Sequence, residues 1–207
     1  MRIALLHGWG MDRQTWDAVI PLLPEFVCQA DDRGYFGPAE AASPADLVVT
    51  HSLGALRALH TPPEGCRALV VINGFDRFGQ APDFPDGVPG IATTRMAERL
   101  EADAQAELTR FRLRIGAGVP RPIADRAALL ADLDFLRSFD GRGLWQGPLL
   151  LLGGDADLVV RPPHQAACFA DRPEALHSTI PGGGHLLPVT APDACAAAIR
   201  QMAGLIG

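Results

Sequence analysis

A serine at position 52 follows an apolar stretch and precedes a helix-forming one, in the segment VVTHSLGA over residues 48–55. A strand that turns sharply into a helix holds a serine hydroxyl above the sheet, where it can attack a carbonyl carbon. Such a turn needs small residues two positions before and after the serine. Gly54 meets this need, whereas Thr50 stands where glycine is usual. The segment predicts a nucleophile, and the alternative is a serine that only caps a helix.

Two other loops carry side chains that could activate this hydroxyl. His185 follows three glycines in PGGGHLLP, residues 181–188, and an imidazole there could act as the base. Asp155 and Asp157 lie in GGDADLVV, and either carboxylate could accept from the imidazole Nδ1–H and fix its tautomer. The alternatives are a histidine that is merely solvated and an aspartate that only shapes a turn.

The segment HGWG, residues 7–10, could supply the electrostatic part of the same chemistry. The backbone N–H of Trp9, together with that of Leu53 after the serine, would form a two-donor oxyanion hole. A glycine-rich turn here could instead suggest dinucleotide binding. However, Arg13 stands where the third glycine of G-x-G-x-x-G would be required.

Six short apolar segments predict the strands that position these loops, and four stretches predict flanking helices. Strands and helices alternate along the chain, which is typical of an α/β fold with a mainly parallel sheet. The carboxyl ends of parallel strands meet at one sheet edge, so the loops should converge there. The expected strands are Ile3–Leu6, Phe26–Gln29, Leu47–Val49, Ala68–Ile72, Leu149–Leu152 and Leu176–Ile180, and the expected helices are Asp12–Leu23, Leu53–His60, Pro162–Ala170 and Asp193–Ile206.

Residues 75–147 interrupt this alternation, and the segment is too long for a simple connection between strands. Two helical patterns, Thr94–Ile115 and Ile123–Phe139, follow a stretch rich in glycine and proline. We therefore expect a helical lid insertion over the sheet, within a single domain that spans residues 1–207.

Composition restricts the class of protein. The 24 acidic residues outnumber the 18 basic ones, giving a net charge of −6, which argues against a general nucleic-acid binder. The start of the chain does not resemble a secretory signal, and no apolar stretch is long enough to span a membrane. The cysteines form no CxxC pair, so we expect buried thiols in a cytoplasmic protein, with no zinc site; they are Cys28, Cys66, Cys168 and Cys195.

The order oxyanion loop, serine, aspartate, histidine is that of the α/β-hydrolase fold. HGWGMDRQTW, residues 7–16, resembles the oxyanion segment of the pimeloyl-[acyl-carrier protein] methyl ester esterases of biotin synthesis, in the α/β-hydrolase superfamily. DRGYFG, residues 32–37, is similar to the D-x-x-G-x-G loop of that superfamily. The pattern G-x-x-D-x-x-V maps onto residues 154–160 and favours Asp157, and G-G-H maps onto residues 183–185. The chain resembles a short, divergent member of this group, and we expect its first strand to be the one before the oxyanion loop, without the family's usual first two strands.

The resemblance implies an α/β-hydrolase fold and a carboxylic ester hydrolase with Ser52 as nucleophile, His185 as base and Asp157 as the orienting acid. It implies a methyl ester carried by acyl-carrier protein as substrate, and no metal or organic cofactor. The lid segment from Arg95 to Arg142 holds nine arginines and eight acidic residues, which is compatible with docking the acidic carrier or with a solvated helical surface. The expected substrate-contacting residues are Trp9, His51, Phe75, Phe111 and Leu186.

Other activities stay open at this level. The same side chains would serve a thioesterase, a lactonase, a carbon–carbon bond hydrolase or another small-molecule esterase. A non-catalytic ligand-binding protein of this fold is the alternative from a different class.

Overall fold

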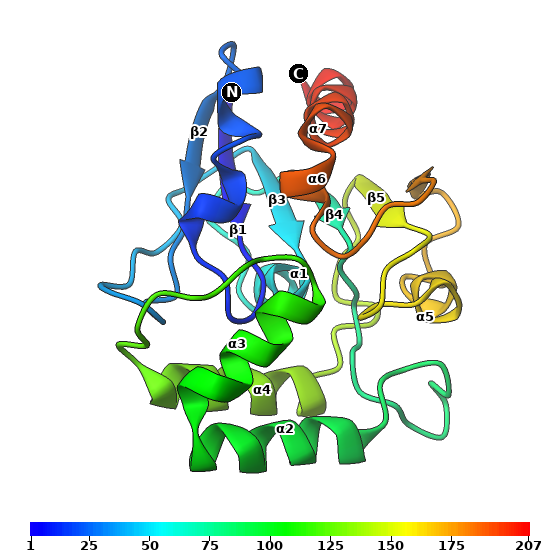
Figure 1. Cartoon of the computed structure of the whole chain (residues 1–207). Coiled ribbons are helices and arrows are strands. Elements are labelled where there is room, and N and C mark those ends of the chain that lie inside the picture. Colours follow the sequence, from blue (N-terminus) through cyan, green and yellow to red (C-terminus); the bar gives the residue numbers. More distant parts are fainter.

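The computed structural model describes residues 1–207 and contains one six-stranded parallel sheet with the strand order β2-β1-β3-β4-β5-β6 (Figure 1). The predicted α/β class, with a mainly parallel sheet and flanking helices, is confirmed. All six expected strands are present, with ends within two residues of the expected ones. They are β1 (Arg2–Leu6), β2 (Val27–Ala30), β3 (Leu47–His51), β4 (Ala68–Ile72), β5 (Leu149–Gly154) and β6 (Leu176–Ile180).

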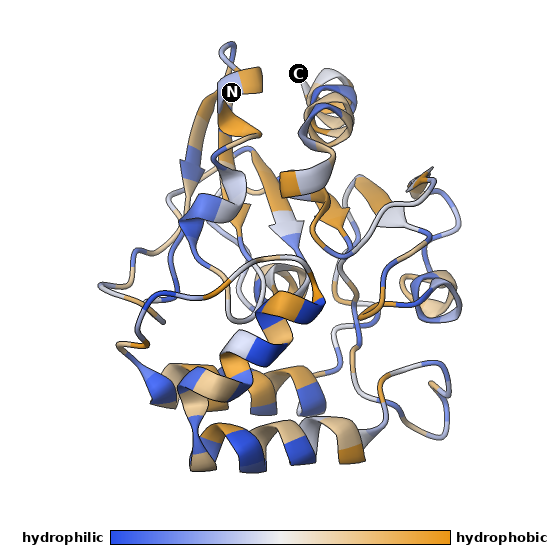
Figure 2. Cartoon of the chain, in the orientation of Figure 1, coloured by the Kyte–Doolittle hydropathy of each residue, from blue (hydrophilic) through white to orange (hydrophobic).

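The central strands are apolar throughout because both faces of the sheet are covered. Successive side chains of a strand point to opposite faces. Val48 accordingly packs in the hydrophobic cluster that includes helix α1 (Leu53–His60), whereas Val49 packs in the cluster that includes helix α7 (Pro192–Ile206). Figure 2 shows this core as orange strands with the amphipathic α7 on one side. The two layers of helices thus fix the sheet in place on both faces.

The insertion between β4 and β5 contains three helices, α2 (Gly90–Ala102), α3 (Ala104–Arg114) and α4 (Arg126–Ser138). They lie together beyond the tip of β3, at the edge where the strands end (Figure 1). The prediction of one helix over Thr94–Ile115 is wrong. The chain breaks at Asp103, which has an extended backbone and accepts a hydrogen bond from the Ala106 N–H. Aspartate favours this N-cap position over a helix interior, and it starts a second helix in a new direction.

The predicted helix over Asp12–Leu23 is also wrong. Two short 3₁₀ turns, η1 (Arg13–Trp16) and η2 (Ile20–Leu22), replace it. Pro21 lacks an N–H and its ring would clash with the carbonyl four residues earlier, so a continuous helix cannot form. The apolar spacing still has its expected effect, since Trp16 is fully buried against the sheet.

Two short helices complete the architecture. α5 (Pro162–Ala167) is shorter than predicted, and α6 (Leu187–Thr190) was not predicted at all. α6 begins two residues after His185 and joins the loop after β6 to α7 (Figure 1). None of the helices combines the length and the apolar character that crossing a membrane would require.

Candidate active site

Ser52 occupies a strained turn between β3 and α1. Its backbone φ of 54° lies in the left-handed region, which non-glycine residues rarely adopt and which is often associated with function. A Cβ at Gly54 would lie 2.4 Å from the Leu6 carbonyl oxygen, so only glycine fits the following turn of α1. Thr50 is tolerated because its hydroxyl is buried within the sheet and donates to the Val70 carbonyl of β4 at 3.4 Å. The local backbone therefore presents the Ser52 side chain at the sheet edge.

Three of the predicted residues form one hydrogen-bonded chain. His185 Nε2 lies 3.1 Å from Ser52 Oγ, and His185 Nδ1 lies 2.8 Å from Asp157 Oδ2. The three residues follow β3, β5 and β6, and all three are buried. The competing carboxylate, Asp155, is exposed and accepts instead from the Gly182 N–H. The structure thus brings Asp157, and not Asp155, to the imidazole.

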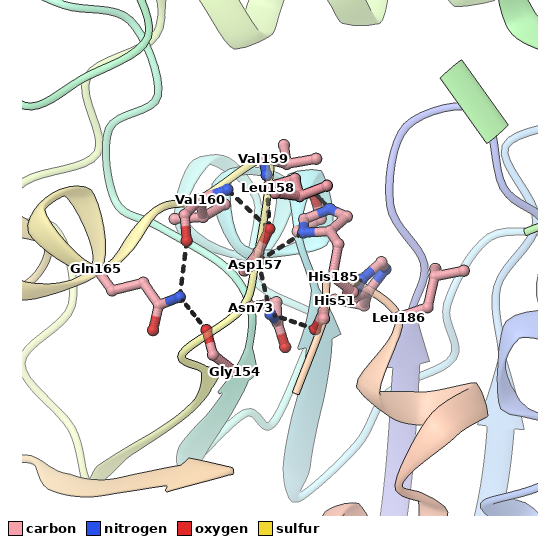
Figure 3. A network of polar contacts seen from close by, with 12 residues as sticks. His51, Asn73, Gly154, Asp157, Leu158, Val159, Val160, Gln165, His185 and Leu186 are labelled. Carbon is pink, nitrogen blue, oxygen red and sulfur yellow. Dashed lines mark hydrogen bonds and ion pairs between the residues drawn. The ribbon is translucent and has the colours of Figure 1, made fainter. Parts of the chain in front are cut away.

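Asp157 accepts four hydrogen bonds (Figure 3). Its Oδ1 accepts from the N–H groups of Val159 and Val160, and its Oδ2 accepts from His185 Nδ1 and from Asn73 Nδ2 at 2.6 Å. Burial by itself would raise the pKa of Asp157, but the bond to His185 and the other donors outweigh burial and hold the pKa below its ordinary value. The carboxylate is ionised at neutral pH, so His185 carries its proton on Nδ1 and offers Nε2 to the serine hydroxyl.

The segment HGWG lies directly against the serine. A Cβ at Gly8 would meet Ser52 Cβ at 3.0 Å, which shows how closely this loop approaches. The Trp9 backbone N–H has no hydrogen-bond partner within the protein. The Leu53 N–H is in the first turn of α1, where helix N–H groups have no acceptor within their own helix. Neither N–H group therefore has a hydrogen-bond acceptor within the protein.

His7 was not singled out from the sequence, yet it fixes this loop. Its Nδ1 donates to the Gly8 carbonyl at 2.8 Å, and its Nε2 accepts from the Arg33 N–H at 3.0 Å. Burial lowers the pKa of His7, so the ring stays neutral and keeps this pair of bonds. The sequence gives no direct signal for the contact, because Arg33 lies in a loop after a different strand.

A cavity of about 430 Å³ opens above Ser52, between the sheet edge and the helical insertion. Its wall combines apolar side chains with guanidinium groups. Trp9 and Phe111, both predicted to contact substrate, line it with rings in an edge-to-face arrangement 5.1 Å apart. The Trp9 indole N–H donates to the Leu129 carbonyl of α4, which ties the ring to the insertion. The other apolar wall residues include Phe78, Met96, Leu133 and Leu136.

Three predicted contact residues do not line this cavity. Phe75 is fully buried beneath Phe78, whose ring lies 4.8 Å away and occupies the wall in its place. Leu186 is buried just before α6. His51 is buried and points toward the backbone of the His185 loop. All three side chains are buried, and that of Phe75 belongs to the hydrophobic core.

Two further residues at the site were missed. Asn73 follows β4 and donates to Asp157, and the only available signal was its position at the end of a central strand. His164 of α5 lines the cavity and its Nε2 donates to the Arg77 carbonyl at 2.9 Å. No group of three His, Cys, Asp or Glu side chains is arranged to hold a metal ion, and the four cysteines are free thiols.

The fold agrees with the comparisons to known proteins. The model of the alpha/beta hydrolase family matches residues 26–198, and the chain belongs to this family. A pimeloyl-[acyl-carrier protein] methyl ester esterase of Neisseria meningitidis serogroup C is 28% identical over 130 residues, which cover 53% of this chain and 51% of the relative. The chain therefore spans about half the length of that relative.

Other similarities extend over more of the chain. An esterase of the same name from Pectobacterium atrosepticum is 27% identical over an alignment of 232 positions. The alignment covers 93% of this chain and 90% of the relative. Among solved structures, a thermophilic esterase from Thermogutta terrifontis superposes with a TM-score of 0.77 at 19% identity, covering 100% of this chain and 90% of that one. The structural similarity establishes the fold alone.

Proposed function

We propose that this protein is a serine hydrolase of carboxylic esters. The observation that carries the proposal is the continuous chain from Ser52 Oγ through His185 to Asp157 at the mouth of a cavity. A serine hydroxyl is a weak nucleophile until a base removes its proton, and an oriented neutral imidazole is that base.

The reaction follows from the positions of these groups. Ser52 Oγ attacks the ester carbonyl carbon while its proton moves to His185 Nε2, and the carbonyl oxygen becomes an oxyanion facing the Trp9 and Leu53 N–H groups. The carbon–oxygen bond to the alcohol then breaks, and His185 gives its proton to the leaving alcohol. Water, deprotonated by His185, attacks the acyl-enzyme and releases the acid, with the proton returned to Ser52 Oγ. Asp157 stabilises the imidazolium that forms in each half.

We propose pimeloyl-[acyl-carrier protein] methyl ester as the substrate, and a role in biotin synthesis. The names of the relatives support this assignment, and so does the cavity. Its apolar wall suits a methylene chain, and arginines stand along it. Arg99 and Arg110 are paired with Glu107, whereas Arg95 and Arg161 are exposed and form no ion pair within the protein. These two guanidinium groups are free to meet an acidic carrier, with helices α2–α4 acting as the lid.

The test compares two substrates. The purified protein is given pimeloyl-ACP methyl ester and, separately, a short p-nitrophenyl ester, beside the Ser52→Ala variant. Cleavage of both substrates, lost in the variant, is the expected result. Cleavage of the short ester alone would retain the hydrolase and reject the carrier-bound substrate. If the unmodified protein cleaves neither, the catalytic proposal fails and a ligand-binding role takes its place.

A further inference from the structure

Two side chains outside the triad hold the loop that carries His185 (Figure 3). His51, the last residue of β3, lies with its Nε2 2.8 Å from the His185 carbonyl oxygen. Asn73, directly after β4, donates from Nδ2 to the Gly184 carbonyl oxygen at 3.1 Å. Two successive carbonyl groups of one loop are therefore bonded to the ends of the two central strands.

The loop before His185 is intrinsically flexible, so bonds to its carbonyl groups would restrict its conformation. Residues 182–184 are three consecutive glycines, which have more backbone freedom than any other residue. Gly182 adopts a φ of 70°, and Gly183 packs so tightly on Gly154 that a Cβ would meet its Cα at 3.1 Å. A flexible segment thus precedes the proposed base, while the reaction requires its imidazole in one position.

His51 is fixed in one tautomer and one charge state. A carbonyl oxygen can only accept, so Nε2 carries the proton and donates. Nδ1 is then a buried lone pair without a partner, and a second proton there would have no acceptor. Burial, followed by the charge of His185, lowers the pKa of His51 to about 3. The ring centroids of His51 and His185 lie 5.0 Å apart, and a neutral ring at that distance does not oppose the imidazolium that catalysis forms.

The side chain of Asn73 is oriented so that both N–H groups of its amide donate hydrogen bonds. Both partners of its Nδ2, the Asp157 carboxylate and the Gly184 carbonyl, are acceptors, so the orientation of the amide is determined. Its Oδ1 is buried without a partner, and its φ of 47° lies in the left-handed region. Both features cost stability, and such costs persist where the surrounding structure enforces a functional arrangement.

We propose that His51 and Asn73 are positioning residues that clamp the His185 loop by two successive carbonyl groups. The inference rests on the proposed hydrolase function. His51 fixes the backbone of His185 itself. Asn73 contacts both sides of the His185–Asp157 bond, since it binds the carboxylate and the loop that carries the imidazole. Together they hold His185 Nε2 at the distance from Ser52 Oγ that proton transfer needs.

Three variants and one control test the clamp through turnover of a short p-nitrophenyl ester. His51→Leu removes the donor, while His51→Gln keeps an N–H donor at the position of the imidazole Nε2. Asn73→Gly removes the amide and keeps a residue that accepts the left-handed backbone. His177→Leu makes the same change at an exposed position of β6. We expect kcat to fall about 10²-fold in His51→Leu and Asn73→Gly with KM nearly unchanged, as for other misplaced catalytic groups. His51→Gln should recover most of the loss, and His177→Leu should match the unmodified protein.

The pH profile separates a positioning role of Asn73 from a role in general stability. Among the titratable groups, His185 contacts Asp157, and His51 and His164 are close enough to interact with its charge. Loss of the Asn73 bond makes the carboxylate more basic and strengthens its hold on the imidazolium. The acid limb of kcat/KM should therefore move to higher pH in Asn73→Gly and stay in place in His51→Leu. A merely structural role would lower the melting temperature without moving that limb.

Proton NMR of the His185 Nδ1–H provides a readout without turnover. We expect a slowly exchanging downfield signal in the unmodified protein and in His51→Gln, and its loss in His51→Leu at a temperature where the variant is folded. If His51→Leu and Asn73→Gly keep both kcat and this signal, the clamp is wrong. If the unmodified protein cleaves no ester, the proposed function fails, and the NMR signal still decides the clamp.

Discussion

At the scale of single residues, hydrogen bonds in the site fix the orientation of each side chain and the nitrogen on which His185 carries its proton. Asp157 has every lone-pair direction filled, so it cannot rotate away from His185. The imidazole in turn can offer only Nε2 to Ser52. The backbone turn that holds the serine requires glycine at position 54, because any larger side chain there would clash with the Leu6 carbonyl.

Asp157→Asn tests the assignment of the acid. An asparagine keeps the shape of the side chain but can present an N–H to His185, which favours the wrong tautomer. We expect kcat on a short ester to fall about 10⁴-fold, with the fold intact by circular dichroism. Asp155→Asn is the matched control and should retain nearly full activity. The opposite ranking of the two variants would identify Asp155 as the acid.

Gly54→Ala tests the turn itself. The added Cβ would lie 2.4 Å from the Leu6 carbonyl oxygen, a backbone atom that cannot move aside. We expect the free energy of unfolding in urea to fall by about 1–3 kcal/mol, together with a loss of esterase activity. Gly37→Ala, where a Cβ would meet nothing within 4 Å, should leave both unchanged. Equal behaviour of the two variants would contradict the packing described here.

The partners of Asp157 and Asn73 illustrate what the sequence could not reveal at this scale. The serine, the aspartate and the histidine each belong to a local motif. Asn73 has no motif, because its partners lie 84 and 111 residues further along the chain. The substrate contact of His51 stays a prediction: its neighbour Ser52 lines the cavity, whereas the His51 side chain bonds to the His185 carbonyl.

At the scale of elements, the strands could be predicted well and two helical regions could not. Buried parallel strands are apolar on both faces, so β4 was predicted at its observed bounds. The edge strand β6 was also predicted at its observed bounds, although its three middle residues are exposed. Apolar spacing alone did not reveal where helices stop. Pro21 prevents a helix over Asp12–Leu23, and Asp103 divides the long helix of the insertion, since its side chain caps α3.

Asp76, in the loop after β4, makes the stability of the fold depend on pH. Asp76 is buried, accepts from the Phe169 N–H at 2.8 Å, and has its other oxygen unpartnered. Burial raises its pKa from 3.8 to about 6. Between these two pH values the folded protein holds a proton that the unfolded chain has released, so stability decreases as pH rises through this range.

Asp76→Asn should remove that dependence. We expect the unmodified protein to lose on the order of 2 kcal/mol of unfolding free energy from this group between pH 4 and pH 6. Urea titrations of Asp76→Asn should show a smaller decrease over the same range, and Asp17→Asn, at an exposed carboxylate, should behave like the unmodified protein. An identical pH slope in Asp76→Asn and the unmodified protein would show that this carboxyl is not perturbed.

At the scale of the whole molecule, charge is distributed unevenly around the cavity. The chain carries a net charge of −6, yet five arginines line the cavity wall, against two acidic residues. Arg95 lies on α2 and Arg161 precedes α5, so the two unpaired guanidinium groups reach the cavity wall from different elements. Such charges mainly affect encounter with a charged partner, and salt weakens them.

Replacement of both arginines tests the carrier as partner. In Arg95→Ala/Arg161→Ala, KM for pimeloyl-ACP methyl ester should rise roughly three- to tenfold, because each exposed ion pair contributes little by itself. KM and kcat for the short ester should not change. Arg2→Ala, at the start of β1 and away from the cavity, is the control. An unchanged KM for the carrier-bound ester, or an equal rise for both esters, would rule out docking by these arginines.

The most direct test of the central claim is covalent labelling of Ser52. A fluorophosphonate probe reacts with a serine that a neighbouring base activates. Intact-mass and peptide mass spectrometry should find one probe per chain, on the peptide that contains Ser52, with labelling slowed sharply in His185→Ala and absent in Ser52→Ala. Labelling at another residue, or labelling of Ser52 at the same rate without His185, would contradict the account of an activated serine at the end of β3.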